Sequence, residues 1–191
     1  MESPYYIIGL IYCMASHRLM LKVTWNQPTF KSLIEAVAPL SEEIKMTFNA
    51  EGVEIRVVDY AHVCFIKAII HPDSFTAYEV TDQVVIATEI DKLKSILKLA
   101  KKNPIVMSWG VDKEKDGLLH FEVGDVVKDV GLLQADLVKA PNEPNIELPI
   151  KVKFAKEHYK TGVEAVSDVG SIAKIGYDGK NAYMNCQGSN D

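Results

Sequence analysis

The 191-residue chain has a net charge of −5, and 48% of its residues are hydrophobic and 25% charged. This composition suits one large or two small globular domains and excludes wholesale disorder. The negative charge argues against a protein coated in positive charge to grip nucleic acid, although it allows a local basic surface. Cys13, Cys64 and Cys186 are too widely spaced to favour a disulfide framework or a cysteine zinc site. No apolar stretch approaches the roughly 18 residues of a membrane helix, so we expect a soluble protein of a reducing compartment.

Residues 1–19 do not fit the pattern of a signal peptide. Their apolar run, from Tyr5 to Ala15, follows the acidic Glu2, and the first cations come only after the run. A signal peptide begins with a basic segment instead. We therefore interpret residues 1–19 as an N-terminal extension, either disordered or upstream of a mis-assigned start, and Met20 as the opening of a strand.

A repeated helix pattern is the strongest organising signal in the sequence. Residues 28–38, 91–102 and 155–167 each carry apolar residues at the i, i+3, i+4, i+7 spacing of a helix with one buried face. Pro28 suits a first helical turn, and Pro39 ends the first helix. The expected buried positions are Phe30, Leu33, Ile34 and Val37, then Leu93, Ile96, Leu97 and Ala100, and finally Tyr159, Gly162, Val163 and Val166.

The segments around the helices repeat as well. A short β-rich run precedes each helix, and a hairpin pattern with glycine in or beside the turn follows it. The expected strands are 20–25, 44–49, 53–58 and 63–70, then 84–88, 105–109, 118–123 and 127–135, and finally 148–154, 173–177 and 182–186. The sequence thus predicts an α+β fold of repeated strand-helix-strand-strand-strand units.

A polar stretch rich in proline and asparagine separates the second repeat from the third and indicates a connector. We divide the chain into an N-terminal domain of two repeats at 20–135, a connector at 136–147 and an incomplete C-terminal domain at 148–191. An incomplete domain leaves apolar surface open to water, which soluble proteins rarely tolerate.

Lysine recurs at one position of each predicted helix, directly after the first buried anchor: Lys31, Lys94 and Lys160. Solvated lysines are ordinary on any helix, and that interpretation remains open. If the repeats are related by symmetry, however, the lysines line one common surface. Such a surface holds phosphates without reading bases, because lysine is a point charge without bidentate preference.

No catalytic motif is visible. The sequence lacks the spacings of a phosphate loop, a dinucleotide fold, a zinc protease and a serine hydrolase. His62 and Cys64, on one face of an expected strand, come nearest to a metal pair, but two ligands do not make a site and packing is the simpler interpretation. We expect no metal, no cofactor and no enzymatic activity.

Several stretches are specific in their order and spacing: Phe30–Leu40, Gly52–Asp59, Asp59–Val63, Phe75–Val80, Asp91–Ala100 and Ser167–Gly170. Together they resemble the DNA sliding clamps of archaea and eukaryotes, the proliferating cell nuclear antigen family. The resemblance implies four such repeats in two domains, with three chains closing into a ring that has helices inside and sheets outside. It also implies a DNA polymerase processivity factor that encircles duplex DNA and tethers replication and repair enzymes.

The resemblance assigns roles to three sets of residues. The lysines facing DNA would be Lys31, Lys92, Lys94, Lys98, Lys101, Lys102 and Lys160. The pocket for the apolar anchors of a partner peptide would involve Val58, His62, Val63, Phe65, Glu147, Leu148 and Pro149, of which the apolar members could equally be sheet core. Edge strands pairing between subunits would use Val127, Val130, Leu132 and Leu133 against Ala182, Met184 and Cys186 of the next chain; the 182–186 strand could equally lie at a sheet margin.

The implied partners are double-stranded DNA bound through its phosphates, a clamp loader, DNA polymerase, flap endonuclease, ligase and the other subunits of a homo- or heterotrimer, with no membrane. The implied location is the archaeal cytoplasm, or the nucleus in a eukaryote. The missing fourth repeat, the acidic Glu164 on the third helix and the polar connector depart from the family pattern. Two rival interpretations therefore stay open: a degenerate or checkpoint-type clamp that only binds partners, and a small α+β enzyme.

Overall fold

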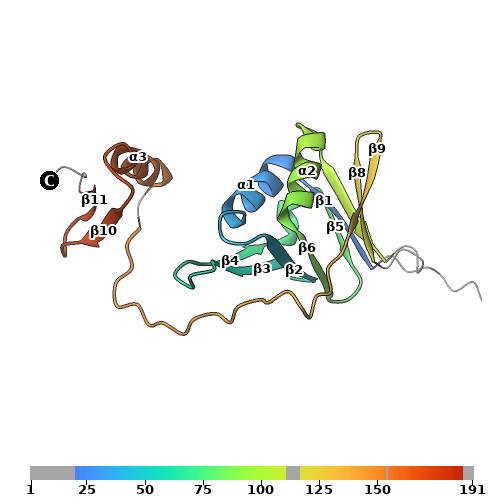
Figure 1. Ribbon diagram of the computed structural model, residues 1–191, viewed down its shortest axis with the longest axis horizontal. Coiled ribbons are helices and arrows are strands. Elements are labelled where there is room, and N and C mark those ends of the chain that lie inside the picture. Colours follow the sequence, from blue (N-terminus) through green and yellow to red (C-terminus); the bar gives the residue numbers. More distant parts are fainter. Residues whose placement is uncertain (1–19, 111–116, 154, 187–191) are drawn as a thin grey trace, which may run out of the picture. The chain divides into compact units, whose positions relative to one another are not determined.

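The computed structural model describes residues 20–110, 117–153 and 155–186 (Figure 1). The chain divides into two compact units, Met1–Glu143 and Pro144–Asp191, and each is described by itself. The boundary falls within the expected connector, so that most of the connector belongs to the first unit. The proposed N-terminal extension, residues 1–19, lies outside the described residues, as do Asp116 and Phe154.

The first unit contains both expected repeats. The first repeat comprises β1 (Leu21–Trp25), α1 (Gln27–Val37), β2 (Glu43–Asn49), β3 (Gly52–Val58), β4 (Phe65–Ile70), the short 3-10 helix η1 (Pro72–Ser74) and β5 (Ala77–Val80). The second comprises β6 (Val84–Glu89), α2 (Ile90–Ala100), β7 (Ile105–Trp109), β8 (Leu118–Val123) and β9 (Val126–Gly131).

The two repeats exchange strands with each other. β1 pairs antiparallel with β7, so that Val23 lies opposite Met107, and β2 pairs antiparallel with β6, so that Met46 lies opposite Ile86. The resulting sheets have the strand orders β5-β1-β7-β8-β9 and β4-β3-β2-β6. Helices α1 and α2 pack against one another (Figure 1). Each repeat therefore completes a sheet of the other.

A continuous hydrophobic core fills the first unit. All four predicted positions of α1 are buried, because the core faces that side of the helix along its whole length. In α2, Ile90 is buried where no core residue was predicted, and Leu97 is only half-buried because it faces a groove between the helices. Trp25 anchors the core, with ring centroids 4.9 Å from Phe30 and 4.5 Å from Phe75.

Some boundaries in the first unit differ from the prediction. The short strand β5, which was not predicted, pairs with the outer side of β1. β4 begins at Phe65 rather than at residue 63. β9 ends at Gly131 rather than at residue 135: the Leu132 amide still bonds to the Gly117 carbonyl just before β8, but the Leu133 amide bonds to the Ala87 carbonyl of β6, in the other sheet.

The second unit contains α3 (Lys156–Ser167), β10 (Ala173–Tyr177) and β11 (Ala182–Cys186), and the two strands form a hairpin. The predicted strand at 148–154 is wrong, since residues 148–153 form no strand. A strand needs a neighbour for its backbone hydrogen bonds, and within the described part of this unit β10 pairs with β11 alone.

The predicted buried face of α3 is also wrong. The side chains of Tyr159 and Val163 are 42% and 39% exposed, and Gly162 and Val166 are only half-buried. Gly162 lies close to the Met184 side chain of β11. In the first unit the equivalent face of α1 is covered by a second helix and two sheets; the described part of the second unit contains no such cover.

Candidate functional site

The first candidate site is a shallow groove of about 490 Å³ between α1 and α2. Three lysines reach it from the two helices, Lys31 from α1 and Lys94 and Lys98 from α2. The rest of its wall is formed by apolar residues, among them Ile34 and Leu97, and by the polar side chains of Gln27 and Glu35. The sequence analysis expected these lysines on one surface, and the groove brings them together.

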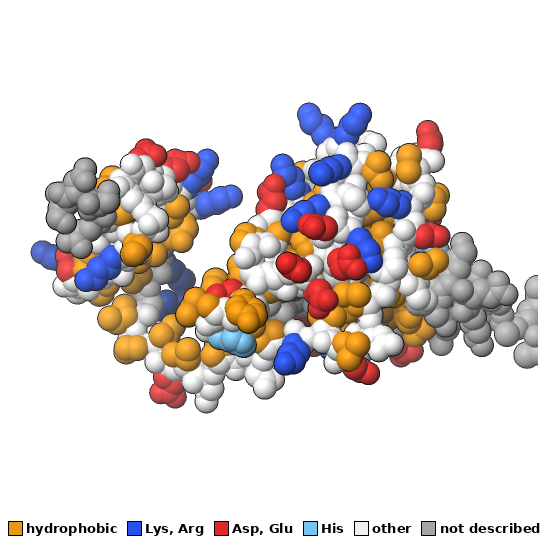
Figure 2. All heavy atoms as spheres, viewed as in Figure 1, with side chains coloured by type: hydrophobic (Ala, Val, Ile, Leu, Met, Phe, Trp, Pro, Cys, Tyr) orange, Lys and Arg blue, Asp and Glu red, His pale blue; other side chains and the backbone are white. Residues whose placement is uncertain are grey.

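Carboxylates on the same helices partly neutralise these lysines. Lys31 Nζ lies 3.6 Å from Glu35, and Lys94 Nζ lies 2.9 Å from Asp91, whose pKa is lowered by that hydrogen bond. Accordingly, Figure 2 shows basic and acidic side chains interleaved over the helices rather than a uniformly basic surface. Exposed pairs of this kind contribute little stability, so the lysines can exchange a carboxylate for a phosphate.

The remaining lysines of the expected set are spread more widely. Lys92 is half-buried and lies 2.9 Å from Glu89, while Lys101 and Lys102 are exposed just beyond the end of α2. Lys160 belongs to the second unit, where its Nζ lies 3.7 Å from Glu164 on α3. These four lysines do not line the groove.

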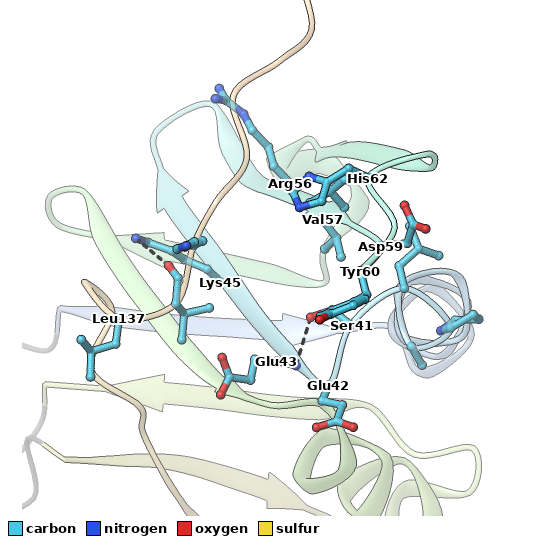
Figure 3. Close-up of a pocket in the computed structure, with 16 residues that line it drawn as sticks. Ser41, Glu42, Glu43, Lys45, Arg56, Val57, Asp59, Tyr60, His62 and Leu137 are labelled. Carbon is cyan, nitrogen blue, oxygen red and sulfur yellow. Dashed lines mark hydrogen bonds between the residues drawn. The ribbon is translucent and has the colours of Figure 1, made fainter.

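The second candidate site is a hollow of about 1140 Å³ in the first unit, here called the connector pocket (Figure 3). Three segments enclose it: residues 38–45 between α1 and β2, residues 56–62 around the end of β3, and residues 137–139 of the connector. Its apolar members are Ala38, Pro39, Leu40, Val57, Val58, Leu137 and Val138. Ionisable side chains, among them Glu42, Lys45 and Asp59, line the pocket together with the apolar ones, so the pocket offers both apolar contacts and charges.

A single carboxylate holds the loop on one side of this pocket. Asp59 Oδ1 accepts hydrogen bonds from the amides of Val63 at 2.8 Å and Cys64 at 2.7 Å. The hydrogen bond from the Cys64 amide is the largest of the causes that lower the pKa of Asp59. The loop also gives His62 a backbone φ of 57°, a left-handed conformation that is uncommon outside glycine.

The expected pocket residues divide into three groups. Val58 and His62 line the connector pocket, whereas Val63, 84% exposed, and the half-buried Phe65 are not among its lining residues. Glu147, Leu148 and Pro149 belong to the second unit, which is described by itself. His62 and Cys64 lie in the loop before β4 instead of on a strand, so the expected shared strand face is wrong. Among the described residues no group of three or more metal-ligating side chains occurs.

The sequence analysis missed the pocket wall formed by Leu137, Val138 and Lys139. Val138 is only 6% exposed, although it was assigned to a solvated connector. Two adjacent apolar residues in an otherwise polar stretch were the available signal. A buried residue there means that the connector begins by packing on the first unit.

The expected subunit edges differ in accessibility. β9 lies at the margin of its sheet, and Val127 on it is 68% exposed. Val130 has its side chain buried in the core, so at an edge between subunits only its backbone is available for pairing. Leu132 and Leu133 are half-buried beyond the end of β9, with their amides bonded within the first unit. β11 has one edge against β10; on it Ala182 is exposed, and Met184 and Cys186 are half-buried.

Comparison with known families places most of the first unit in one of them. The sequence model of the family described as "Proliferating cell nuclear antigen, N-terminal domain" matches residues 20–137, more than half of the chain. The chain belongs to the proliferating cell nuclear antigen family. The similar proteins are sliding clamps and not enzymes, which excludes the interpretation as a small α+β enzyme.

Curated relatives of the family come from archaea. The DNA polymerase sliding clamp of Picrophilus torridus is 27% identical over 82% of this chain, and that of Methanosarcina acetivorans is 27% identical over 90%. The chain spans 62% of the length of the first and 69% of the second. Among the described helices, none is long and apolar enough to cross a membrane.

Solved structures share the fold. A proliferating cell nuclear antigen from A. fulgidus, bound to the C-terminal region of FEN-1, superposes with a TM-score of 0.81 at 23% identity over 90% of this chain and 69% of its own. The protein from Entamoeba histolytica gives a TM-score of 0.72 at 14% identity over 91% and 72% of the two chains. At these identities the likeness establishes the sliding-clamp fold alone.

Proposed function

We propose that the chain is a subunit of a DNA sliding clamp, a processivity factor that holds replication and repair enzymes on duplex DNA. The observation that carries the proposal is the convergence of Lys31, Lys94 and Lys98 on one groove between paired helices. Lysines contact phosphates without selecting a base. A clamp needs such contacts, because strong base-specific contacts would stop it from sliding.

The test is binding of a 30-base-pair duplex measured by fluorescence anisotropy at several salt concentrations. Lys31→Ala combined with Lys98→Ala removes two groove cations, and we expect weaker binding with a salt slope lower by about two. The matched control, Lys22→Ala with Lys174→Ala, removes two exposed lysines from strands. Equal losses in both double variants would contradict the groove and indicate a response to net charge alone.

We further propose that the connector pocket takes a partner segment carrying apolar anchors. Apolar side chains form part of its lining, and a few anchors buried against such side chains carry most of the binding energy of an interface. A similar clamp binds the C-terminal region of FEN-1. The proposed partners are therefore flap endonuclease and, by the same docking, the clamp loader, DNA polymerase and ligase, inside the cell where the DNA is.

Ring formation is proposed through the edges of β9 and β11 in a homo- or heterotrimer. The exposed Val127 on a marginal strand supports it, because an unpaired edge is a template for another chain. Light scattering at several concentrations measures the mass; three times 21.3 kDa supports a homotrimer, and Val127→Lys should reduce that mass. A monomer that closes only with other subunits would support a heterotrimer.

A second candidate is a clamp relative that only binds partners. Two of the three groove lysines are paired with carboxylates, Lys31 with Glu35 and Lys94 with Asp91, which weakens their attraction for phosphate. This candidate predicts peptide binding at the connector pocket together with no measurable retention on DNA. Retention that depends on Lys31 and Lys98 would exclude it.

A further inference from the structure

One lysine of the first unit reaches across to the connector. Lys45 lies on β2, and its Nζ donates a hydrogen bond to the Ala135 carbonyl oxygen at 2.7 Å; the Val138 carbonyl oxygen lies 3.4 Å away (Figure 3). Its side chain is half-buried and contributes to the wall of the connector pocket. A lysine ammonium has three donors and no acceptor, so it can serve several carbonyls together.

The connector needs such donors at this point. β9 ends at Gly131, and residues 134–143 have no strand neighbour that would accept or donate ladder bonds. Between the two carbonyls that face Lys45 lies Leu137, and Val138 is buried. The same lysine therefore fixes the backbone before and after residues 136–137, and we call residues 135–138 the wall of the pocket.

An ion pair forms a second contact between the first unit's sheet and the connector, farther along the chain. Lys67 Nζ on β4 is 2.6 Å from Glu143 Oε2, and this hydrogen bond is the main cause that lowers the pKa of Glu143. The carboxylate side chain is 55% exposed. Salt screens an exposed charge pair, whereas a half-buried bond to neutral carbonyls is less affected. The Lys45 bonds therefore hold the wall under conditions that weaken the Lys67 pair.

We propose that Lys45 is a positioning residue for the connector pocket: it holds residues 135–138 in the conformation that receives a partner segment. The inference rests on the proposed docking function. Binding to a wall already in place avoids the entropy of ordering it. Without the ammonium, residues 135–138 can adopt several conformations, and a partner must order them when it binds.

The experiment compares Lys45→Met, which keeps an unbranched side chain and removes the donors, with Lys45→Arg, which keeps them. The probe is a fluorescein-labelled peptide of the C-terminal region of FEN-1 from A. fulgidus. We expect about tenfold weaker binding for Lys45→Met and affinity within about threefold of the wild type for Lys45→Arg. Lys22→Met, a change of an exposed lysine on β1, is the control and leaves the affinity unchanged.

Hydrogen exchange of residues 136–139 gives the second readout. Lys45→Met should speed exchange there at least fivefold, while the unfolding midpoint followed by tryptophan fluorescence stays constant. Unchanged exchange, or unchanged affinity in Lys45→Met, overturns the proposal. If the wild type fails to bind the peptide, the docking function is wrong for this probe, and the exchange comparison still decides whether Lys45 holds the wall.

Discussion

The two units of the chain carry the same helix pattern with opposite results. Ile34-Glu35-Ala36-Val37 in α1 recurs as Val163-Glu164-Ala165-Val166 in α3. Ile34 and Val37 are buried, whereas Val163 is 39% exposed and Val166 half-buried. The difference lies in the surroundings: α1 faces a second repeat that exchanges strands with its own, and α3 faces one hairpin. An apolar stripe thus identifies the face that can be buried, and the neighbouring repeat decides whether it is buried.

The largest expected effect comes from changing equivalent positions in the two helices. Ile34→Ala should lower the free energy of unfolding of the first unit by about 2–5 kcal/mol, because it leaves a cavity in a closed core. Val163→Ala should change stability by less than about 0.5 kcal/mol. Both tryptophans, Trp25 and Trp109, lie in the first unit, so urea unfolding followed by their fluorescence measures Ile34→Ala, while hydrogen exchange of the α3 amides measures Val163→Ala in the second unit. Equal losses in the two variants would refute the contrast.

The next largest expected effect is a difference between the two units in their rate of cleavage by trypsin. Lys151, Lys153 and Lys174 are exposed in a unit without buried side chains among its described residues, so they should be cut at least tenfold faster than Lys22 and Lys45. Mass spectrometry of early time points identifies the sites. Cleavage in β1 or β2 before cleavage in the second unit would contradict the expected order.

A smaller effect should distinguish two loops that aspartates hold in the same way. Asp178 Oδ1 accepts the amides of Asn181 at 2.7 Å and Lys180 at 2.8 Å, much as Asp59 holds its loop. Asp178→Ala should speed hydrogen exchange across the β10–β11 hairpin severalfold, because the hairpin has little core to hold it. Asp59→Ala should leave the β3–β4 ladder unchanged, with faster exchange only in its own loop. Equally faster hydrogen exchange in the β3–β4 and β10–β11 ladders would argue against the difference between the units.

The smallest expected effect is the response of the Asp59 and Asp178 loops to low pH. Backbone amides lower the pKa of both carboxyls, that of Asn181 first for Asp178 and that of Cys64 first for Asp59. A lowered pKa means stability that is present above the unfolded value of 3.8 and lost as the pH falls through the folded value. Amide chemical shifts of both loops should therefore change below pH 3.8. A transition near pH 5 would disagree with the lowered values.

Most of the first unit could be predicted from sequence, because its apolar periodicity agrees with its burial. The four core positions of α1 and the β2–β3 hairpin were found this way. The burial of Val130 was not foreseen, because alternation along β9 does not say which side faces the core. The contact between the connector and β2 was missed because Lys45 is 90 residues from Ala135 and 93 from Val138, and no local pattern links them. The conformation of His62 depends on Asp59, which holds the loop from its far end.

Strand exchange also sets when the protein can fold during its synthesis. β1 leaves the ribosome early, but its central partner β7 follows only after the rest of the first repeat and α2 have been made. At the usual rate of chain elongation this interval is on the order of ten seconds. Throughout it Leu21, Val23 and Trp25, which are buried in the finished protein, lack the part of the core that the second repeat supplies. The first unit can therefore close its core only after β7 has left the ribosome.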